Sequence, residues 1–127
     1  EPHKRKLKKL KIKHLQKDFS LANNYKNAKA DLSSTGNTTI YTCPIATQSI
    51  IKSILISNDS GSADTLNITL TNSASAIFSV FKAKSIASNT TVELLSQPLI
   101  IEEAEILKAQ ATTADRLHII VSFLEVN

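Results

Sequence analysis

The sequence predicts an all-β protein: a single β-sandwich of jelly-roll type with about eight strands, preceded by an extended basic N-terminal arm. Three observations carry this prediction. Short segments rich in β-branched residues recur at roughly 8–12-residue spacing, separated by turn residues. No helical pattern of about 10–15 residues alternates with them, which argues against a parallel α/β sheet. The positive charge is concentrated in one terminal segment.

The chain has 127 residues, enough for one domain with one core. Hydrophobic residues make up 42% and Trp is absent, so the core must come from Ile, Leu, Val and Ala. Residues 1–30 hold ten Lys or Arg and two acids, whereas residues 31–127 hold five Lys or Arg and nine acids. A basic tail is therefore joined to a mildly acidic body.

Strand-like segments fill the body of the chain. Residues 65–71 alternate between apolar and polar, so we expect Leu66, Ile68 and Leu70 to face the core. Residues 49–57 are nearly continuously apolar, which is typical of a strand buried on both faces. The eight predicted strands are 38–43, 49–57, 65–71, 76–83, 90–95, 98–101, 106–111 and 117–126. The sandwich is therefore expected at 38–127.

The arm and a polar linker are expected to fill residues 1–37. Residues 20–37 are rich in Asn, Ser and Ala and predict a linker, with a short helix at Leu21–Ala30. In "KRKLKKLKIKHLQK" (4–17), eight of fourteen residues are basic and none is acidic. Its apolar residues fit neither a helical stripe nor a strand, so we expect an extended arm shaped by a partner. The predicted partner-binding residues are Lys4, Arg5, Lys6, Leu7, Lys8, Lys9, Leu10, Lys11, Ile12, Lys13, Leu15, Lys17 and Phe19.

Two partners fit such an arm. Lysines bind nucleic acid through phosphate contacts that weaken with salt. The alternative partner is an acidic protein surface on a neighbouring subunit, where charge adds attraction and speeds association. Nucleic acid requires only the charge, so the large apolar residues within the arm favour protein; they are Leu7, Leu10, Ile12, Leu15 and Phe19.

A carbohydrate-binding sandwich is a further alternative. Sugar binding would need exposed aromatic platforms. The aromatic candidates in the predicted body are Tyr41, Phe78, Phe81 and Phe123. Most of them alternate into apolar strands, so this function ranks last.

No catalytic, metal or cofactor site is predicted. The chain has no Gly-x-Ser-x-Gly turn and no Gly-rich phosphate loop, so we expect no enzyme. Glu102, Glu103 and Glu105 cluster, but one short turn cannot surround Ca²⁺ with oxygen ligands, and a solvated turn is expected. Cys43 has uncharged neighbours and is expected to be a small apolar residue at a strand end.

The sequence also predicts no zinc site at its histidines and no sorting signal. His3, His14 and His118 do not have zinc-site spacing, and His118 is expected at the surface or an interface. No apolar run is long enough to span a membrane or to follow the basic segment as a signal peptide would. Asn-x-Ser/Thr triplets, which an Asn-, Ser- and Thr-rich sequence produces by chance, occur at Asn37, Asn58, Asn67 and Asn89.

Residues 38–126 resemble a family of small virion proteins of tailed phages. The similar segments are "TTIYTCP", "SIIKSILISNDSGSADTLNITL" and "SIASNTTVELLSQPLIIEEAEILKAQATTADRLHIIVSFLEV". The resemblance implies a structural subunit located in the virion, as a capsid decoration, head–tail or tail component, with copies in a homo-oligomer or symmetric array. Ala104-Glu105 stands where the family usually has Gly-Asp, and the family's Gly after Pro44 is missing. The arm lies outside the resemblance.

Overall fold

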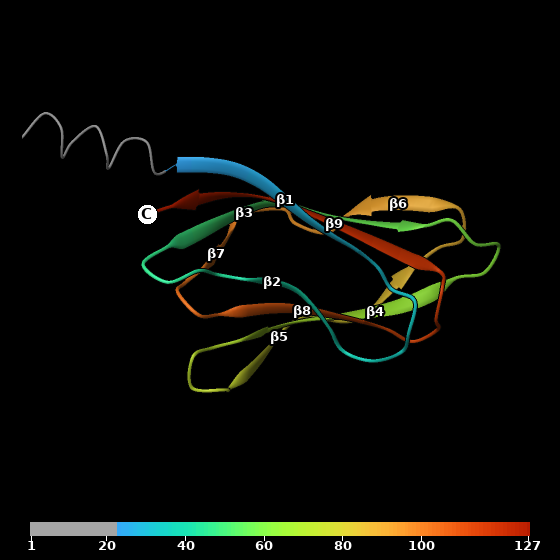
Figure 1. Cartoon of the computed structure of the whole chain (residues 1–127). Coiled ribbons are helices and arrows are strands. Elements are labelled where there is room, and N and C mark those ends of the chain that lie inside the picture. Colours follow the sequence, from blue (N-terminus) through green and yellow to red (C-terminus); the bar gives the residue numbers. More distant parts are fainter. Residues whose placement is uncertain (1–22) are drawn as a thin grey trace, which may run out of the picture.

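The computed structural model describes residues 23–127, and within them every regular element is a β-strand (Figure 1). The strands are β1 (Asn23–Asp31), β2 (Thr38–Thr42), β3 (Gln48–Asn58), β4 (Asp64–Thr71), β5 (Ile77–Ile86), β6 (Thr90–Glu93), β7 (Leu99–Ile101), β8 (Ile106–Ala111) and β9 (Leu117–Val126). In this described part no helix is long and apolar enough to cross a membrane.

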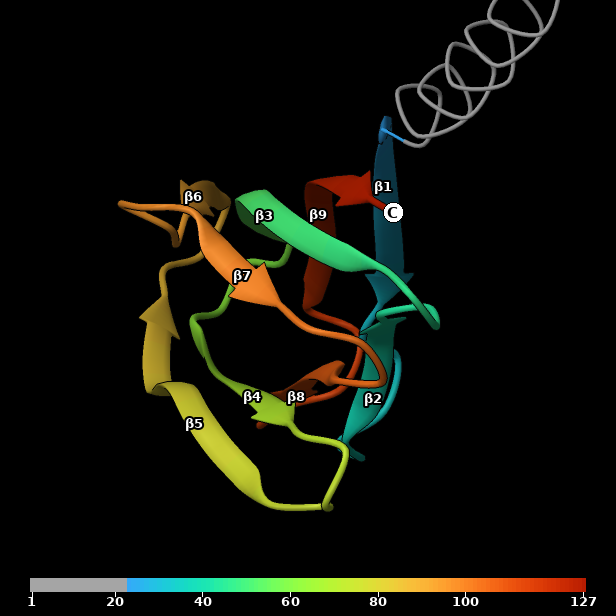
Figure 2. The same ribbon diagram turned by 90° about the vertical axis from the view of Figure 1, so that its left-hand side faces the viewer.

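Two antiparallel sheets face one another, as the end-on view in Figure 2 shows. Sheet A has the order β1-β9-β3-β6, with β7 also pairing with β3. Sheet B has the order β2-β8-β4-β5. β6 and β7 pair with opposite ends of β3, so they act as one interrupted strand. With that strand counted once, each sheet has four strands, and consecutive strands lie in opposite sheets except β4 and β5, which are neighbours in sheet B.

The core lies between the sheets and consists mainly of branched aliphatic side chains. Inward residues alternate with outward ones along each strand, because successive side chains point to opposite faces. Leu66 and Ile68 are fully buried, as predicted, and Leu70 packs against the same core. The largest fully buried side chains are Leu32, Ile51, Ile54, Ile56, Leu66, Ile68, Ile86, Ile101, Leu107, Leu117, Ile119 and Val121.

The predicted β-sandwich is confirmed, and all eight segments predicted as strands form strands. The prediction for β3 was wrong in one respect. Its outward residues Ile50 and Leu55 are only half-buried, because no element that the structure describes covers the outer face of sheet A. A bulge at Lys52, between Ile51 and Ser53, shifts the register against β9.

The linker prediction for residues 20–37 was also wrong where the structure describes it. Asn23–Asp31 is not helical but forms β1, which pairs along its whole length with β9. Its sequence carries little strand signal, and only Ala28 and Ala30 pack against the core. The free edge of β9 supplies the pairing, so the backbone ladder decides the conformation instead of side-chain propensity. Leu32 then enters the core and ends the strand.

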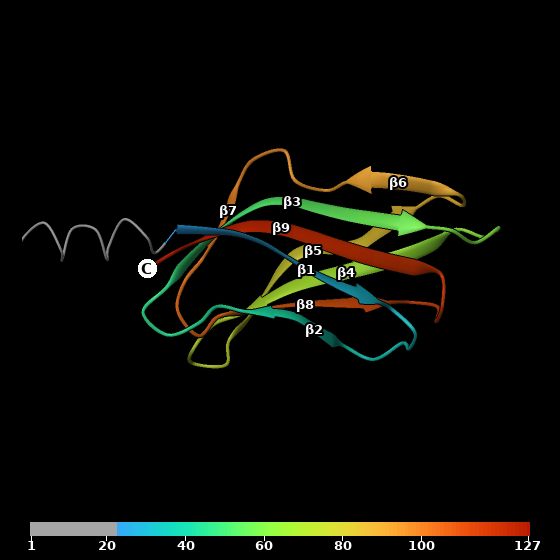
Figure 3. The same ribbon diagram turned by 45° about the horizontal axis from the view of Figure 1, so that its top comes forward.

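The start of β1 lies at the same end of the sandwich as the end of β9 (Figure 3). Asn23 is opposite Val126, and Val126 is in turn opposite Gln48 on β3. The basic segment therefore joins the sandwich at an outer corner of sheet A. Residues 1–22, which include every predicted arm contact and His3 and His14, lie outside the described residues.

Candidate interaction surface

The outer face of sheet A carries a row of apolar side chains that crosses four strands. Tyr25 on β1 is opposite Leu124 on β9, Leu124 is opposite Ile50 on β3, and Ile50 is opposite Ile100 on β7. Directly opposed residues point to the same face with their Cβ atoms about 5 Å apart. We call Tyr25, Leu124, Ile50 and Ile100 the apolar row.

The apolar row is accessible to solvent. Tyr25 is 79% exposed and Ile100 is 49% exposed, whereas Leu124 and Ile50 between them are half-buried. Two further apolar side chains, Ile120 and Leu55, lie opposite each other farther along β9 and β3, and Ile120 is 41% exposed. The polar pair Ser53 and Ser122 separates these two side chains from the apolar row. Exposed apolar side chains aligned across four strands are typical of an interaction site.

The outer face of sheet B is different. Its outward side chains are mainly hydroxyls and amides, at Thr39, Thr65, Asn67, Thr69 and Gln110, with Lys108 among them. Its apolar outward residues are Ile106 and the exposed Ile77, on either side of Thr71. Among the described outward residues of its strands there is no carboxylate. Its edge strand β5 adds two exposed cations, Lys82 and Lys84, near one end. The two faces therefore differ in both polarity and charge.

Acidic side chains border the apolar face of sheet A. Asp31 ends β1, Asp59 follows β3, and Glu93 lies opposite Leu55 on the edge strand β6. Lys29, opposite Ile120, is a cation on this face. Glu93 also holds β6 against the β3 bulge, because its carboxylate accepts from the Ser53 hydroxyl and from Ile54 N at 2.7 Å.

A buried polar cluster secures β1 beneath this face. The Lys26 ammonium on β1 is 2.7 Å from Oε1 of Glu125, whose side chain is 7% exposed. Tyr41 on β2 donates from its hydroxyl to Oε2 of Glu125 at 2.5 Å. Since that proton is committed, the Ser49 hydroxyl on β3 donates to Tyr41 at 2.5 Å. We call Lys26, Tyr41, Ser49 and Glu125 the clasp; it joins three strands of sheet A to sheet B.

The clasp shifts the titration of its two acids in opposite directions. Burial by itself would raise the pKa of Glu125, but hydrogen bonds from Lys26 and Tyr41 and the charge of Lys26 outweigh it, so this pKa is lowered. Burial, and then the hydrogen bond to Glu125, raise the pKa of Tyr41 far above its usual 10.0. Both shifts preserve the ionised carboxylate and the neutral phenol that the geometry needs.

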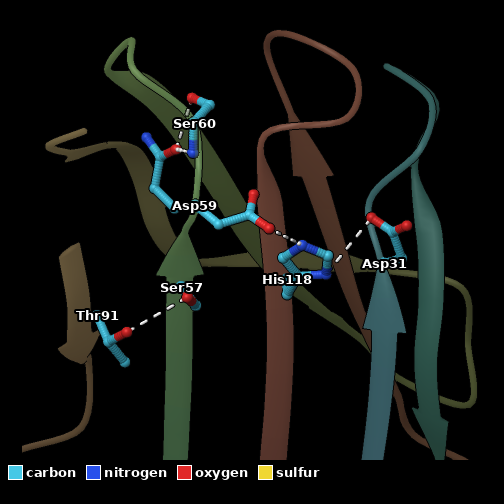
Figure 4. A network of polar contacts seen from close by, with 7 residues as sticks. Asp31, Ser57, Asp59, Ser60, Thr91 and His118 are labelled. Atoms are coloured by element: carbon cyan, nitrogen blue, oxygen red, sulfur yellow. Dashed lines mark hydrogen bonds and ion pairs between the residues drawn. The ribbon is translucent and has the colours of Figure 1, made fainter. Parts of the chain in front are cut away.

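His118 lies between two carboxylates near the far end of sheet A (Figure 4). Its Nε2 is 3.1 Å from Oδ2 of Asp59, and its Nδ1 is 3.6 Å from Oδ1 of Asp31. The histidine is 40% exposed and the carboxylates are 60% or more exposed. The contacts link β9 to the end of β1 and to the β3–β4 turn. This placement at the surface agrees with the sequence prediction for His118.

The other residues singled out in the sequence have local contacts. Glu102, Glu103 and Glu105 lie on the β7–β8 turn, where a Glu105 carboxylate oxygen accepts from Glu102 N at 2.7 Å. Cys43 is buried after β2, and its thiol donates to the Thr47 carbonyl at 3.3 Å. No group of three or more His, Cys, Asp or Glu in residues 23–127 is placed to hold a metal ion.

Two of the hollows on the surface of the described residues are open to solvent. The larger, about 490 Å³, lies at the end of the sandwich where β1 begins and is lined by Ala46, Thr47, Gln48, Glu102, Glu103, Val126 and Asn127. The smaller, about 280 Å³, is lined by Ser57, Asn58, Asp59, Asn89, Thr90 and Thr91. Neither has the mainly apolar, enclosed lining that is usual for small-molecule sites.

Sequence reasoning missed the apolar row and the clasp. The row depends on the register of four strands that are distant in sequence, and one of them, β1, was not predicted. One signal was available: the continuous apolar run 49–57 showed that β3 has apolar residues on both faces. The clasp had no such signal, because its residues are spread from Lys26 to Glu125.

No protein-family model matches the sequence, and no curated protein matches it. Among solved structures, the fold is similar to a chain from Bacillus endospore appendages, described as a novel family of disulfide-linked pili. The TM-score is 0.52 and the identity 9%, over 83% of this chain and 86% of that chain. A chain of infectious bursal disease virus, Gt strain, has a TM-score of 0.39 and 10% identity; 83% of this chain covers 31% of it. The pilus chain shares the β-sandwich fold.

Proposed function

We propose that this chain is a non-enzymatic structural subunit of a repeating particle, and that its basic arm anchors each copy to a neighbour. The observation that carries the proposal is the division of the molecule into a rigid sandwich and a segment with eight cations in fourteen residues. The arm extends the contact area beyond what one small domain offers. Repeated copies then form a symmetric array.

Two further points support an assembly role. The pilus chain, whose fold this sandwich shares, belongs to a polymeric appendage. The outer face of sheet A also carries exposed apolar side chains, which are a common feature of protein–protein contact sites. The resemblance to tailed-phage proteins makes the proposal more specific: a virion subunit at a capsid-decoration, head–tail or tail position.

Nucleic-acid binding is the second candidate function, favoured by the charge of the arm. It predicts affinity that falls steeply with salt, in proportion to the number of lysines in contact. Sugar binding is less well supported than it was by the sequence, because some of its candidate aromatic side chains are buried. Of its four candidate aromatic platforms, Tyr41 and Phe123 are buried, with ring centroids 4.2 Å apart. Phe78 remains 55% exposed.

The test compares two full-length arm variants with the wild-type chain. In one, Leu7, Leu10 and Leu15 become Ser, which keeps every cation. In the other, Lys8, Lys9 and Lys11 become Gln, which keeps every apolar residue. Sedimentation velocity of nuclease-treated protein measures association between copies, and fluorescence anisotropy with duplex DNA at several salt concentrations measures nucleic-acid binding.

We expect both variants to weaken association between copies. Nucleic-acid binding is supported instead if the Ser variant associates as the wild type does and only the Gln variant loses affinity for DNA. In that case the salt slope of log affinity falls by about 0.9 for each lysine that contacted a phosphate.

A further inference from the structure

We propose that the outer face of sheet A is where the arm of a second copy docks, with the apolar row receiving the arm's leucines, Ile12 and Phe19. This inference rests on the proposed function and adds the receiving surface. The occupant is residues 7–19 of another copy, part of the 22 residues outside the described structure.

The chemistry of the surface matches the chemistry of the arm. The apolar row crosses four strands, from Tyr25 at one edge to Ile100 at the other. An arm with five large apolar residues spaced among lysines can bury some of them there and keep its ammonium groups at the margins. Glu93 borders this face on the edge strand β6, and Asp31 and Asp59 lie at its far end, beside His118.

The opposite face does not offer the same match. The described outward residues of sheet B have no carboxylate to attract lysines, and Lys108 lies near the middle of that face. The exposed cations Lys82 and Lys84 on β5 would repel the arm from that edge. Burying hydroxyl and amide side chains under leucine would also cost hydrogen bonds to water.

The course of the chain favours a second copy over the arm's own sandwich. β1 begins at Asn23, opposite Val126, at the end of sheet A where β9 finishes. A return to the same outer face needs a reversal of the chain between Phe19 and Asn23, and only the three residues 20–22 lie between them. Twenty-two residues can reach at most roughly 75 Å, which is ample to cross a neighbouring sheet.

The experiment places a photocrosslinking amino acid at Leu15 or at Phe19 of the full-length chain. Assemblies are formed from equal parts of ¹⁴N and ¹⁵N protein and irradiated after nuclease treatment. Mass spectrometry then identifies the crosslinked peptide and shows whether its isotope differs from that of the arm. We expect mixed-isotope crosslinks to peptides of β1, β3, β7 or β9.

Matched substitutions test the apolar row. Leu124→Thr with Ile100→Thr removes apolar surface from sheet A, and Ile106→Thr makes the same change at a half-buried outward position of sheet B. We expect the double variant of sheet A to lower the crosslink yield about tenfold and Ile106→Thr to leave it unchanged. Tyr25→Ser, at a side chain that is 79% exposed, tests the row without risk to the core.

The outcomes separate this inference from the proposed function. Mixed-isotope crosslinks confined to sheet B peptides overturn the docking face but keep the anchoring function. Crosslinks to sheet A that are all same-isotope, with no mixed pairs, overturn docking by a second copy, because pairing between copies would make about half of them mixed. Absence of any crosslink between copies, together with unchanged association of the arm variants, overturns both.

Discussion

Lys26 and Glu125 form an ion pair that ties the first strand of the sandwich to the last. The Lys26 ammonium lies 2.7 Å from Oε1 of a carboxylate whose side chain is only 7% exposed. β1 buries no large apolar side chain, so this pair and the backbone ladder to β9 hold it in place. The basic segment directly precedes β1 in the chain, and the clasp holds β1 against the core.

Replacing Lys26 by Met should destabilise the protein by about 1 kcal/mol at neutral pH. The change removes the cation from a buried carboxylate, but Lys26 is itself 53% exposed, which limits the loss. Because the pKa of Glu125 is lowered in the folded protein, the contribution is present above its usual value of 4.5 and is lost below it. Urea unfolding should therefore show the stabilities of the two proteins converging as the pH falls below 4.5. Lys29→Met, on the outward side of β1, is the control; an equal loss there would contradict the role of the pair.

Replacing Tyr41 by Phe should cost about 1–3 kcal/mol of unfolding free energy. The Ser49 hydroxyl, fully buried, loses its acceptor, and Glu125 loses a donor. Chemical denaturation measures the change. Tyr25→Phe, at a hydroxyl that is well exposed, should stay within about 0.5 kcal/mol of wild type. Equal effects at the two tyrosines would show that the clasp does not stabilise the fold.

Alkaline pH should also separate wild type from the Tyr41→Phe variant. The pKa of Tyr41 is raised in the folded state, so its contribution is complete below the ordinary value of 10.0 and falls as the pH rises above it. Urea titrations between about pH 8 and pH 11 should show a steeper loss of stability for wild type. Parallel curves would mean that the phenol is not held neutral by its surroundings.

Replacing Asn58 by Ala should destabilise the protein by about 2 kcal/mol or more. The side chain is 1% exposed; its amide donates to the carbonyls of Ser62 and Ile86, and its oxygen accepts from Ser60 N. These bonds hold the β3–β4 turn against β5. Thermal unfolding measures the change, and Asn27→Ala, at an exposed outward position of β1, should be nearly neutral. The burial also leaves Asn58 unsuited to glycosylation.

Replacing Ala104 by Gly should raise the unfolding free energy by up to about 1 kcal/mol. Ala104 has φ of 67°, in the left-handed region that costs an L-residue about 1–2 kcal/mol, part of which Gly recovers. Differential scanning calorimetry measures the change. Ala74→Gly, at an exposed turn residue whose own φ is not positive, should instead lower stability slightly. An equal gain at Ala74 would contradict the explanation given for Ala104.

The sequence by itself determined the sandwich. Alternation at 65–71 placed Leu66 and Ile68 in the core, and turn residues bounded eight of the nine strands. It also determined the separation of charge between the basic segment and the body. These properties depend on residues that are close together in the chain, so the period of a strand and the residue types of a turn can be recognised in the sequence.

Tertiary structure alone decided β1, the apolar row and the clasp. Residues 23–31 have weak strand propensity and pair because β9 offers its backbone edge. Tyr25, Ile50 and Ile100 become neighbours only through the register of β1, β9, β3 and β7. Lys26 and Glu125 meet because β1 and β9 pair in that same register. Register is fixed by burial of one face over the whole sheet, so no local pattern contains it.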